Sequence, residues 1–216
     1  MSACNSGFRN NRIKRKAIPK TTRAAYHEAG HAVMAWLLDI TFENVSIMLL
    51  NEDDGGYGGC FQLQYGEGKK IDQLDIKEKR TTIENYVIMI LAGEISEFLL
   101  TRRHNLLDSL SDYFEAYKMT LHHLCISSDK FDPDNRETEL YMKWLSERCK
   151  IILKTPQNWC AVKTIAHELV KRKVIRGWEA VDIIKNSRLK NDTIQSKKRA
   201  HSNLANSTLK PRNILL

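Results

Sequence analysis

The 216-residue sequence lacks most of the features that mark disulfide-rich, secreted or membrane-spanning proteins. Its five cysteines form an odd set without a CxxC pair, which argues against a disulfide framework and against a cysteine zinc knuckle. The longest strongly apolar run, YVIMILAG, is far shorter than the ~20 residues that span a bilayer. No apolar stretch follows the basic N-terminal residues, as a secretory signal would require. We therefore expect no membrane span, a reducing compartment and a cytoplasmic protein.

Acidic residues are scarce at both ends of the chain. Residues 1–20 carry six Lys/Arg and no acid, and residues 188–216 carry seven Lys/Arg and one acid. Because the formal net charge is +8, residues 21–187 carry −4. Both ends also lack the apolar periodicity of packed elements, which predicts flexible basic tails at 1–20 and 188–216 around one folded domain at 21–187. Such tails are only a weak indication of nucleic acid as a partner.

Helical patterns dominate the folded part. Apolar residues at helical spacing predict helices over residues 21–39, 71–103, 106–125, 137–154 and 158–186, with Gly177 splitting the last into a helix, a turn and a short helix. Between the first two helices, ENVSIMLLN and GCFQLQY flank the glycine-rich EDDGGYGG, which predicts a β-hairpin or a pair of edge strands. The fold class is therefore mainly α with a small β-hairpin or sheet (α+β).

The first helix carries His27, Glu28 and His31 in the HExxH arrangement. Positions four apart share one helix face, so both imidazoles can point at one metal ion. Glu28 lies roughly 100° around the helix from His27, where it can reach a water on the open side of a metal. Gly30 costs a helix ~1 kcal/mol relative to alanine, which indicates that another element packs very close there. An amphipathic helix with two surface histidines is the plainer alternative. We interpret the motif as a zinc (Zn²⁺) site in which Glu28 is the general base.

A hydrolytic zinc site needs a third protein ligand. Met34 and Leu37 occupy the positions at which the extended HExxHxxGxxH pattern requires glycine and histidine, so the ligand must come from a later helix. Spacing alone does not choose among the acidic and histidine side chains of those helices. The candidates are Glu94, Glu97, Asp108, Asp112, Glu115, His104, His122 and His123.

Over about residues 21–185, the sequence resembles the peptidase domain of the FtsH-type ATP-dependent zinc proteases. AAYHEAGHAV is similar to the zinc helix of that family, and NVSIMLL with its glycine-bearing loop is similar to the active-site strand and hairpin. LAGEISEFLL resembles the AGR-x-AEE helix, although Glu94 stands where the family has arginine. SLSDYFEAYKM matches the segment that supplies the third zinc ligand, and NWCAVKTIAHELVKRKVIRG is similar to the C-terminal helix pair.

The resemblance implies a zinc metallopeptidase domain in which Asp112 is the third zinc ligand. It also implies that Glu97 orients a ligating histidine through the free ring N–H. The alternative for Asp112 is an acid favoured at a helix N-terminus by the helix dipole. No GxxxxGK[ST] phosphate loop occurs, so we expect a stand-alone, ATP-independent peptidase domain. A separate unfoldase or adaptor is then a partner to expect, and a homo-oligomer is a further one.

The expected reaction is hydrolysis of peptide bonds in flexible or unfolded polypeptides. Zinc held by His27, His31 and Asp112 would activate water, and Glu28 would carry its proton to the leaving amine. The substrate would pair with the edge of the first strand and contact the glycine-rich loop, whose alternative is a plain turn. The expected substrate-binding residues are Val45, Ser46, Ile47, Gly56, Tyr57 and Gly58. The alternative function is a zinc-bound regulatory or nucleic-acid-associated binding module with little turnover.

Overall fold

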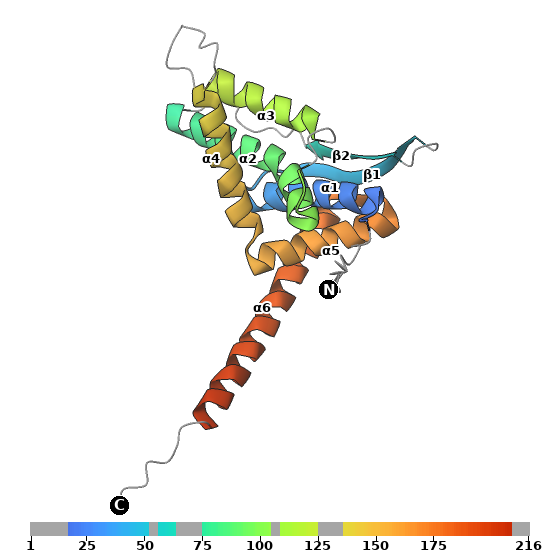
Figure 1. Cartoon of the computed structure of the whole chain (residues 1–216), viewed down its shortest axis with the longest axis vertical. Helices are drawn as coiled ribbons and strands as arrows, with labels where there is room; N and C mark the ends of the chain where they lie inside the picture. Colours follow the sequence, from blue (N-terminus) through green and yellow to red (C-terminus); the bar gives the residue numbers. More distant parts are fainter. Residues whose placement is uncertain (1–16, 52–55, 64–74, 105–108, 125–135, 209–216) are drawn as a thin grey trace, which may run out of the picture.

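The computed structural model describes residues 17–51, 56–63, 75–104, 109–124 and 136–208. Its elements are α1 (Lys20–Leu37), β1 (Phe42–Asn51), β2 (Gly56–Leu63), α2 (Ile76–Thr101), α3 (Leu110–His123), α4 (Arg136–Leu153), α5 (Pro156–Arg172), β3 (Val174–Arg176) and α6 (Gly177–Thr208). Figure 1 shows α1 inside the body, between α2 and α5, with β1 and β2 running alongside it. The predicted combination of mainly helical structure with one small sheet is confirmed.

Helix α1 is the central element, and it contacts α2, α5, β1 and β2. Its interior side chains are small, since Ala25, Ala29 and Ala32 are fully buried. Small side chains let neighbouring backbones approach closely, as they do at Gly30. A Cβ atom at Gly30 would overlap the carbonyl oxygen of Ala92 in α2. The expectation that another element packs tightly against this glycine is confirmed.

Helix α2 contains the longest apolar run of the sequence. Its N-terminus is capped by Asp75, whose carboxylate accepts a hydrogen bond of 2.8 Å from the backbone N–H of Glu78. Its middle is buried between α1, α3 and α4. Neither α2 nor any other helix in the described ranges is long and apolar enough to cross a membrane.

The three strands form an antiparallel sheet in the order β2-β1-β3. Strand β1 is therefore central, with Val45 opposite Phe61 of β2 on one side and Ile175 of β3 on the other. The inner side chains Val45 and Ile47 are buried in the core. The prediction that β1 offers a free edge is wrong where β3 covers it, over residues 44–46. Strand β2 is an edge strand of the described sheet.

The end of the chain differs from the expected helix, turn and short helix. The connection between α5 and α6 is the strand β3, and α6 is 32 residues long. Gly177 is required at this junction because a Cβ atom there would overlap the carbonyl oxygen of Phe42. No glycine or proline follows Gly177 before Pro211, so no residue in between interrupts the helix. Helix α6 thus runs to Thr208, through a stretch predicted to be flexible, and its outer part projects from the body (Figure 1).

Candidate metal centre

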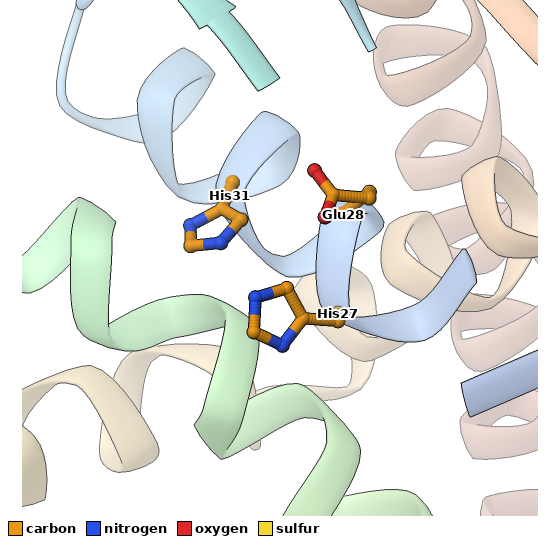
Figure 2. A group of neighbouring side chains, drawn as sticks. All are labelled: His27, Glu28 and His31. Carbon is orange, nitrogen blue, oxygen red and sulfur yellow. The ribbon is translucent and has the colours of Figure 1, made fainter. Parts of the chain in front are cut away.

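Helix α1 brings together the ligand atoms of His27, Glu28 and His31, which all lie within 4.8 Å of one another. These polar residues are almost wholly buried, with exposed fractions of 9%, 5% and 6%. Figure 2 shows the two imidazole rings side by side and the Glu28 carboxylate set apart from them. The arrangement matches the one expected from the four-residue spacing.

Asp112, in the first turn of α3, reaches both histidines. Its Oδ2 lies 2.8 Å from Nε2 of His27 and 3.2 Å from Nε2 of His31. Tetrahedral zinc with bonds of about 2.0–2.1 Å would hold its ligand atoms about 3.3 Å apart. Both N–O distances are close to this value, and the ligand atoms of His27 and His31 lie within 4.8 Å of each other, so these three groups could hold a zinc ion after side-chain movements.

His27, His31 and Asp112 form a hydrogen-bonded cluster in which the pKa values of His31 and Asp112 are strongly shifted. Burial lowers the pKa of His31, but the hydrogen bond and charge of Asp112, the charge of Glu28 and the Met89 carbonyl outweigh it and raise the pKa to about 9. Burial alone would raise the pKa of Asp112, yet hydrogen bonds with His27 and His31 hold it well below its usual range. A metal ion would thus replace a proton held between the carboxylate and the imidazoles.

The backbone of α2 fixes the orientation of His31. Nδ1 of His31 donates a hydrogen bond of 2.9 Å to the carbonyl oxygen of Met89, which is inside α2. With Nδ1 engaged as the donor, Nε2 is the nitrogen that faces Asp112. Metal-binding histidines commonly have such a partner on the second ring nitrogen, which sets the tautomer and the ring direction.

Two glycines, which the sequence analysis did not single out, provide the space around these side chains. A Cβ atom at Gly93 of α2 would lie 2.5 Å from Nε2 of His27 and nearer still to Nε2 of His31. A Cβ atom at Gly59 of β2 would overlap the carboxylate of Glu28. The signal for Gly93 is a glycine inside an apolar helix, where it costs about 1 kcal/mol relative to alanine.

The carboxylate of Glu28 is buried against Gly59, and Oε2 has no hydrogen-bond partner among the described residues. Burial raises the pKa of Glu28, although the nearby His31 and His27 oppose the shift. A buried oxygen without a partner is costly, and a metal-bound water would supply the missing donor. A carboxylate with a raised pKa is also better suited to accept a proton near neutral pH.

Glu97 was expected to orient one of the ligating histidines, but its side chain pairs with Arg23 instead. It forms an ion pair with Arg23 of α1, in which Nη2 of Arg23 lies 2.5 Å from Oε1 of Glu97. The role of orienting a histidine belongs instead to the Met89 carbonyl. Among the other candidates for the third ligand, Glu94 pairs with Nδ1 of His104 at 3.1 Å. Glu115, His122 and His123 are exposed, and Asp108 lies outside the described residues.

The expected substrate-binding residues divide between the core and the hairpin. Val45 and Ile47 are core residues with exposed fractions of 0% and 2%, so their side chains do not line a substrate groove. The hydroxyl of Ser46 donates a hydrogen bond of 3.4 Å to the carbonyl oxygen of Cys60. Gly58, Gly56 and Tyr57 belong to the edge strand β2, and of the last two only the backbone is described. The strand beside Glu28 is β2, because Gly59 of β2 lies against the Glu28 carboxylate.

No protein-family model matches the chain, and a comparison with curated proteins finds no match either. The FtsH-type resemblance therefore rests on the quoted motifs. The functional argument depends on the site itself, which is formed by α1, α2, α3 and β2.

Proposed function

We propose that this protein is a zinc-dependent endopeptidase that hydrolyses peptide bonds in flexible or unfolded polypeptides. The observation that supports this most directly is the convergence of Asp112 with the Nε2 atoms of His27 and His31. Glu28 stands beside these three groups with an oxygen that lacks a partner among the described residues. Three zinc ligands and an adjacent carboxylate are the set that hydrolytic zinc sites use.

Each residue then has a defined task. Bound zinc would lower the pKa of a water molecule and polarise the carbonyl group of the scissile peptide bond. Glu28 accepts the proton of the attacking water and delivers it to the nitrogen of the leaving amine. Asp112 supplies a negative charge to the ligand set, and Met89 keeps His31 in the tautomer that leaves Nε2 free to bind.

The substrate would bind along β2 and not along β1. In the described sheet only one side of β2 is paired, with β1, and Gly59 of β2 lies against the Glu28 carboxylate. An extended peptide can add to such an edge through backbone hydrogen bonds, which place little demand on sequence. The glycine at position 59 keeps a side chain out of the space beside the Glu28 carboxylate.

Unfolded chains are the proposed substrates because a folded protein resists entry. Local opening of a folded domain costs up to its full stability of about 5–15 kcal/mol. No GxxxxGK[ST] phosphate loop occurs in the 216 residues, so cleavage should not respond to ATP. A separate unfoldase or adaptor would deliver folded substrates.

The described cysteines Cys60, Cys149 and Cys160 are free, which supports a reducing, cytoplasmic location.

The test compares purified wild type with Glu28→Gln on an unfolded chain and on a stable folded domain. Each substrate is incubated with and without ATP, and with a chelator followed by added zinc. We expect cleavage of the unfolded chain only, independent of ATP, abolished by the chelator and restored by zinc. Glu28→Gln should keep one zinc per chain and lose cleavage. Cleavage that survives Glu28→Gln, or wild type that binds no zinc, would contradict the proposal.

A second candidate function is a zinc-bound binding module that associates with nucleic acid. It is favoured by the charge of residues 188–216, which carry seven Lys/Arg and one acid. Helix α6 includes part of this segment, and its outer part projects from the body (Figure 1). Nucleic-acid binding through such residues would weaken steeply with added salt. A protein that holds zinc, cleaves no unfolded chain and binds DNA or RNA in this salt-dependent way would favour the second function.

A further inference from the structure

The ion pair between Arg23 and Glu97 lies on the same seam between α1 and α2 as the candidate zinc site. Arg23 precedes His27 by four residues on α1, and Glu97 follows Gly93 by four residues on α2. Residues four apart share one helix face. Arg23 and His27 therefore lie on one face of α1, and Gly93 and Glu97 lie on one face of α2. Nε and Nη2 of Arg23 lie 2.6 Å and 2.5 Å from Oε1 of Glu97.

The side chains of this ion pair are mostly buried. The side chain of Glu97 is 5% exposed, and that of Arg23 is 24% exposed. A buried carboxylate that loses its cation is left desolvated and unpaired, so separation of the two charges is strongly unfavourable. Charge-assisted hydrogen bonds also depend on geometry, whereas apolar packing depends mainly on area. The pair is therefore suited to fixing the position of α1 along α2.

The zinc site has little tolerance for a shift between these two helices. Gly30 lies directly against the carbonyl oxygen of Ala92, and the Nε2 atoms of His27 and His31 lie where a Cβ atom at Gly93 would be. One residue of an α-helix corresponds to about 1.5 Å of rise, so even a fraction of this shift changes both distances to Asp112 appreciably. A metal site with poorly oriented ligands loses affinity although all its ligands are present.

We propose that the Arg23–Glu97 ion pair is a positioning element that sets the register of α1 on α2 and thereby holds His27 and His31 at the spacing that zinc requires. This inference rests on the proposed function, because it assumes that the histidines bind zinc. It gives Glu97 a role that acts through Arg23 and the helix, without contact with a ligating histidine.

The test replaces both charges at once with the variant R23M/E97M. Apolar side chains of similar length in place of a buried ion pair often leave stability unchanged or raise it, so this variant should fold. Zinc affinity is measured by competition with a chelator at fixed pH, and the melting temperature is measured on the zinc-free protein. We expect zinc to bind about 10–100-fold more weakly, with a zinc-free melting temperature close to that of wild type.

The control variant is R172M/E179M, which removes another Arg–Glu pair between two helices. Nη2 of Arg172 in α5 lies 2.8 Å from Oε2 of Glu179 in α6. This variant should bind zinc as tightly as wild type. Arg23→Lys, which keeps a cation at the site, should lose less affinity than R23M/E97M. R23Q/E97Q, which removes both charges but keeps polar side chains, covers the case in which R23M/E97M does not fold and should also bind zinc more weakly than wild type.

Three results would overturn the inference. If R23M/E97M, or R23Q/E97Q where R23M/E97M does not fold, binds zinc as wild type does, the pair does not position the histidines. If R172M/E179M loses as much affinity as R23M/E97M, the effect is general and not specific to this seam. If wild type itself binds no zinc, the proposed function falls and this inference falls with it, which separates that failure from the first two.

Discussion

Replacing Gly93 with alanine would place a methyl group between the two histidines of the candidate zinc site. The new carbon would lie 2.5 Å from Nε2 of His27 and nearer still to Nε2 of His31. A zinc ion would lie about 2.0–2.1 Å from the same two nitrogens. The methyl group and the ion therefore compete for the same space, and at least one imidazole must turn away.

The size of the effect follows from the number of ligands. Structural zinc sites bind with about 10–16 kcal/mol, so each of three protein ligands carries about 3–5 kcal/mol. Disengaging one histidine should then weaken zinc binding about 10²–10⁴-fold, since 1.4 kcal/mol is a factor of ten. In the same helix, alanine is favoured over glycine by about 1 kcal/mol, which offsets part of the packing strain.

The assay is zinc affinity by chelator competition, together with the melting temperature of the zinc-free protein. Ser96→Ala is the matched control, because Ser96 is a buried residue on the same helix whose hydroxyl has no hydrogen-bond partner among the described residues. We expect Ser96→Ala to bind zinc as wild type does. Gly93→Ala with wild-type zinc affinity would refute the placement of the ion at the two Nε2 atoms.

Three further predictions follow from the same geometry. Gly59→Ala should keep zinc but reduce cleavage of an unfolded chain about 10²–10⁴-fold, because the added methyl group displaces the proton acceptor Glu28; wild-type turnover would contradict this. Asp112→Ala should weaken zinc binding about 10²–10⁴-fold, measured by chelator competition, and an unchanged affinity would remove Asp112 from the ligand set. Because zinc must displace the proton of His31, whose pKa is about 9, apparent zinc affinity should rise about tenfold per pH unit from pH 7 towards pH 9 and then level off. Calorimetry in buffers of different ionisation enthalpy should detect the released proton, and a flat profile over this range would oppose the assignment.

The local part of the site was predictable because it lies within one helix. The spacing of His27 and His31 fixes their common face through helix geometry alone. The close contact at Gly30 was also predictable, since a glycine inside a helix is unfavourable unless the missing side chain is needed. The same argument applies to Gly93, which lies inside the apolar helix α2. A close contact at Gly93 could therefore also have been predicted from the sequence of that helix.

The long-range parts were not predictable from spacing. Asp112 is 85 residues from His27, and the sequence left eight candidates for the third ligand that only a family resemblance could rank. The partner of Glu97 is Arg23, which lies 74 residues away and carries no motif signal of its own. Such pairings depend on how whole helices pack, and local periodicity does not encode that.

The order of the strands was missed for a related reason. Strand β3 has three residues, too few for an alternating pattern to be recognised inside a helical stretch. It nevertheless pairs with β1 and turns a predicted edge strand into a central one. The expected substrate edge moved from β1 to β2 as a result.

The 85-residue separation of His27 and Asp112 has a thermodynamic consequence. A zinc ion shared by these residues would act as a reversible cross-link that closes a long loop of the unfolded chain. For a permanent link over such a loop, the chain-entropy model gives about 4–5 kcal/mol of stabilisation. The ion would thus link α1 to α3. Removing it with a chelator would weaken this connection first, because the remainder of the core is held by apolar contacts between α1, α2 and α5.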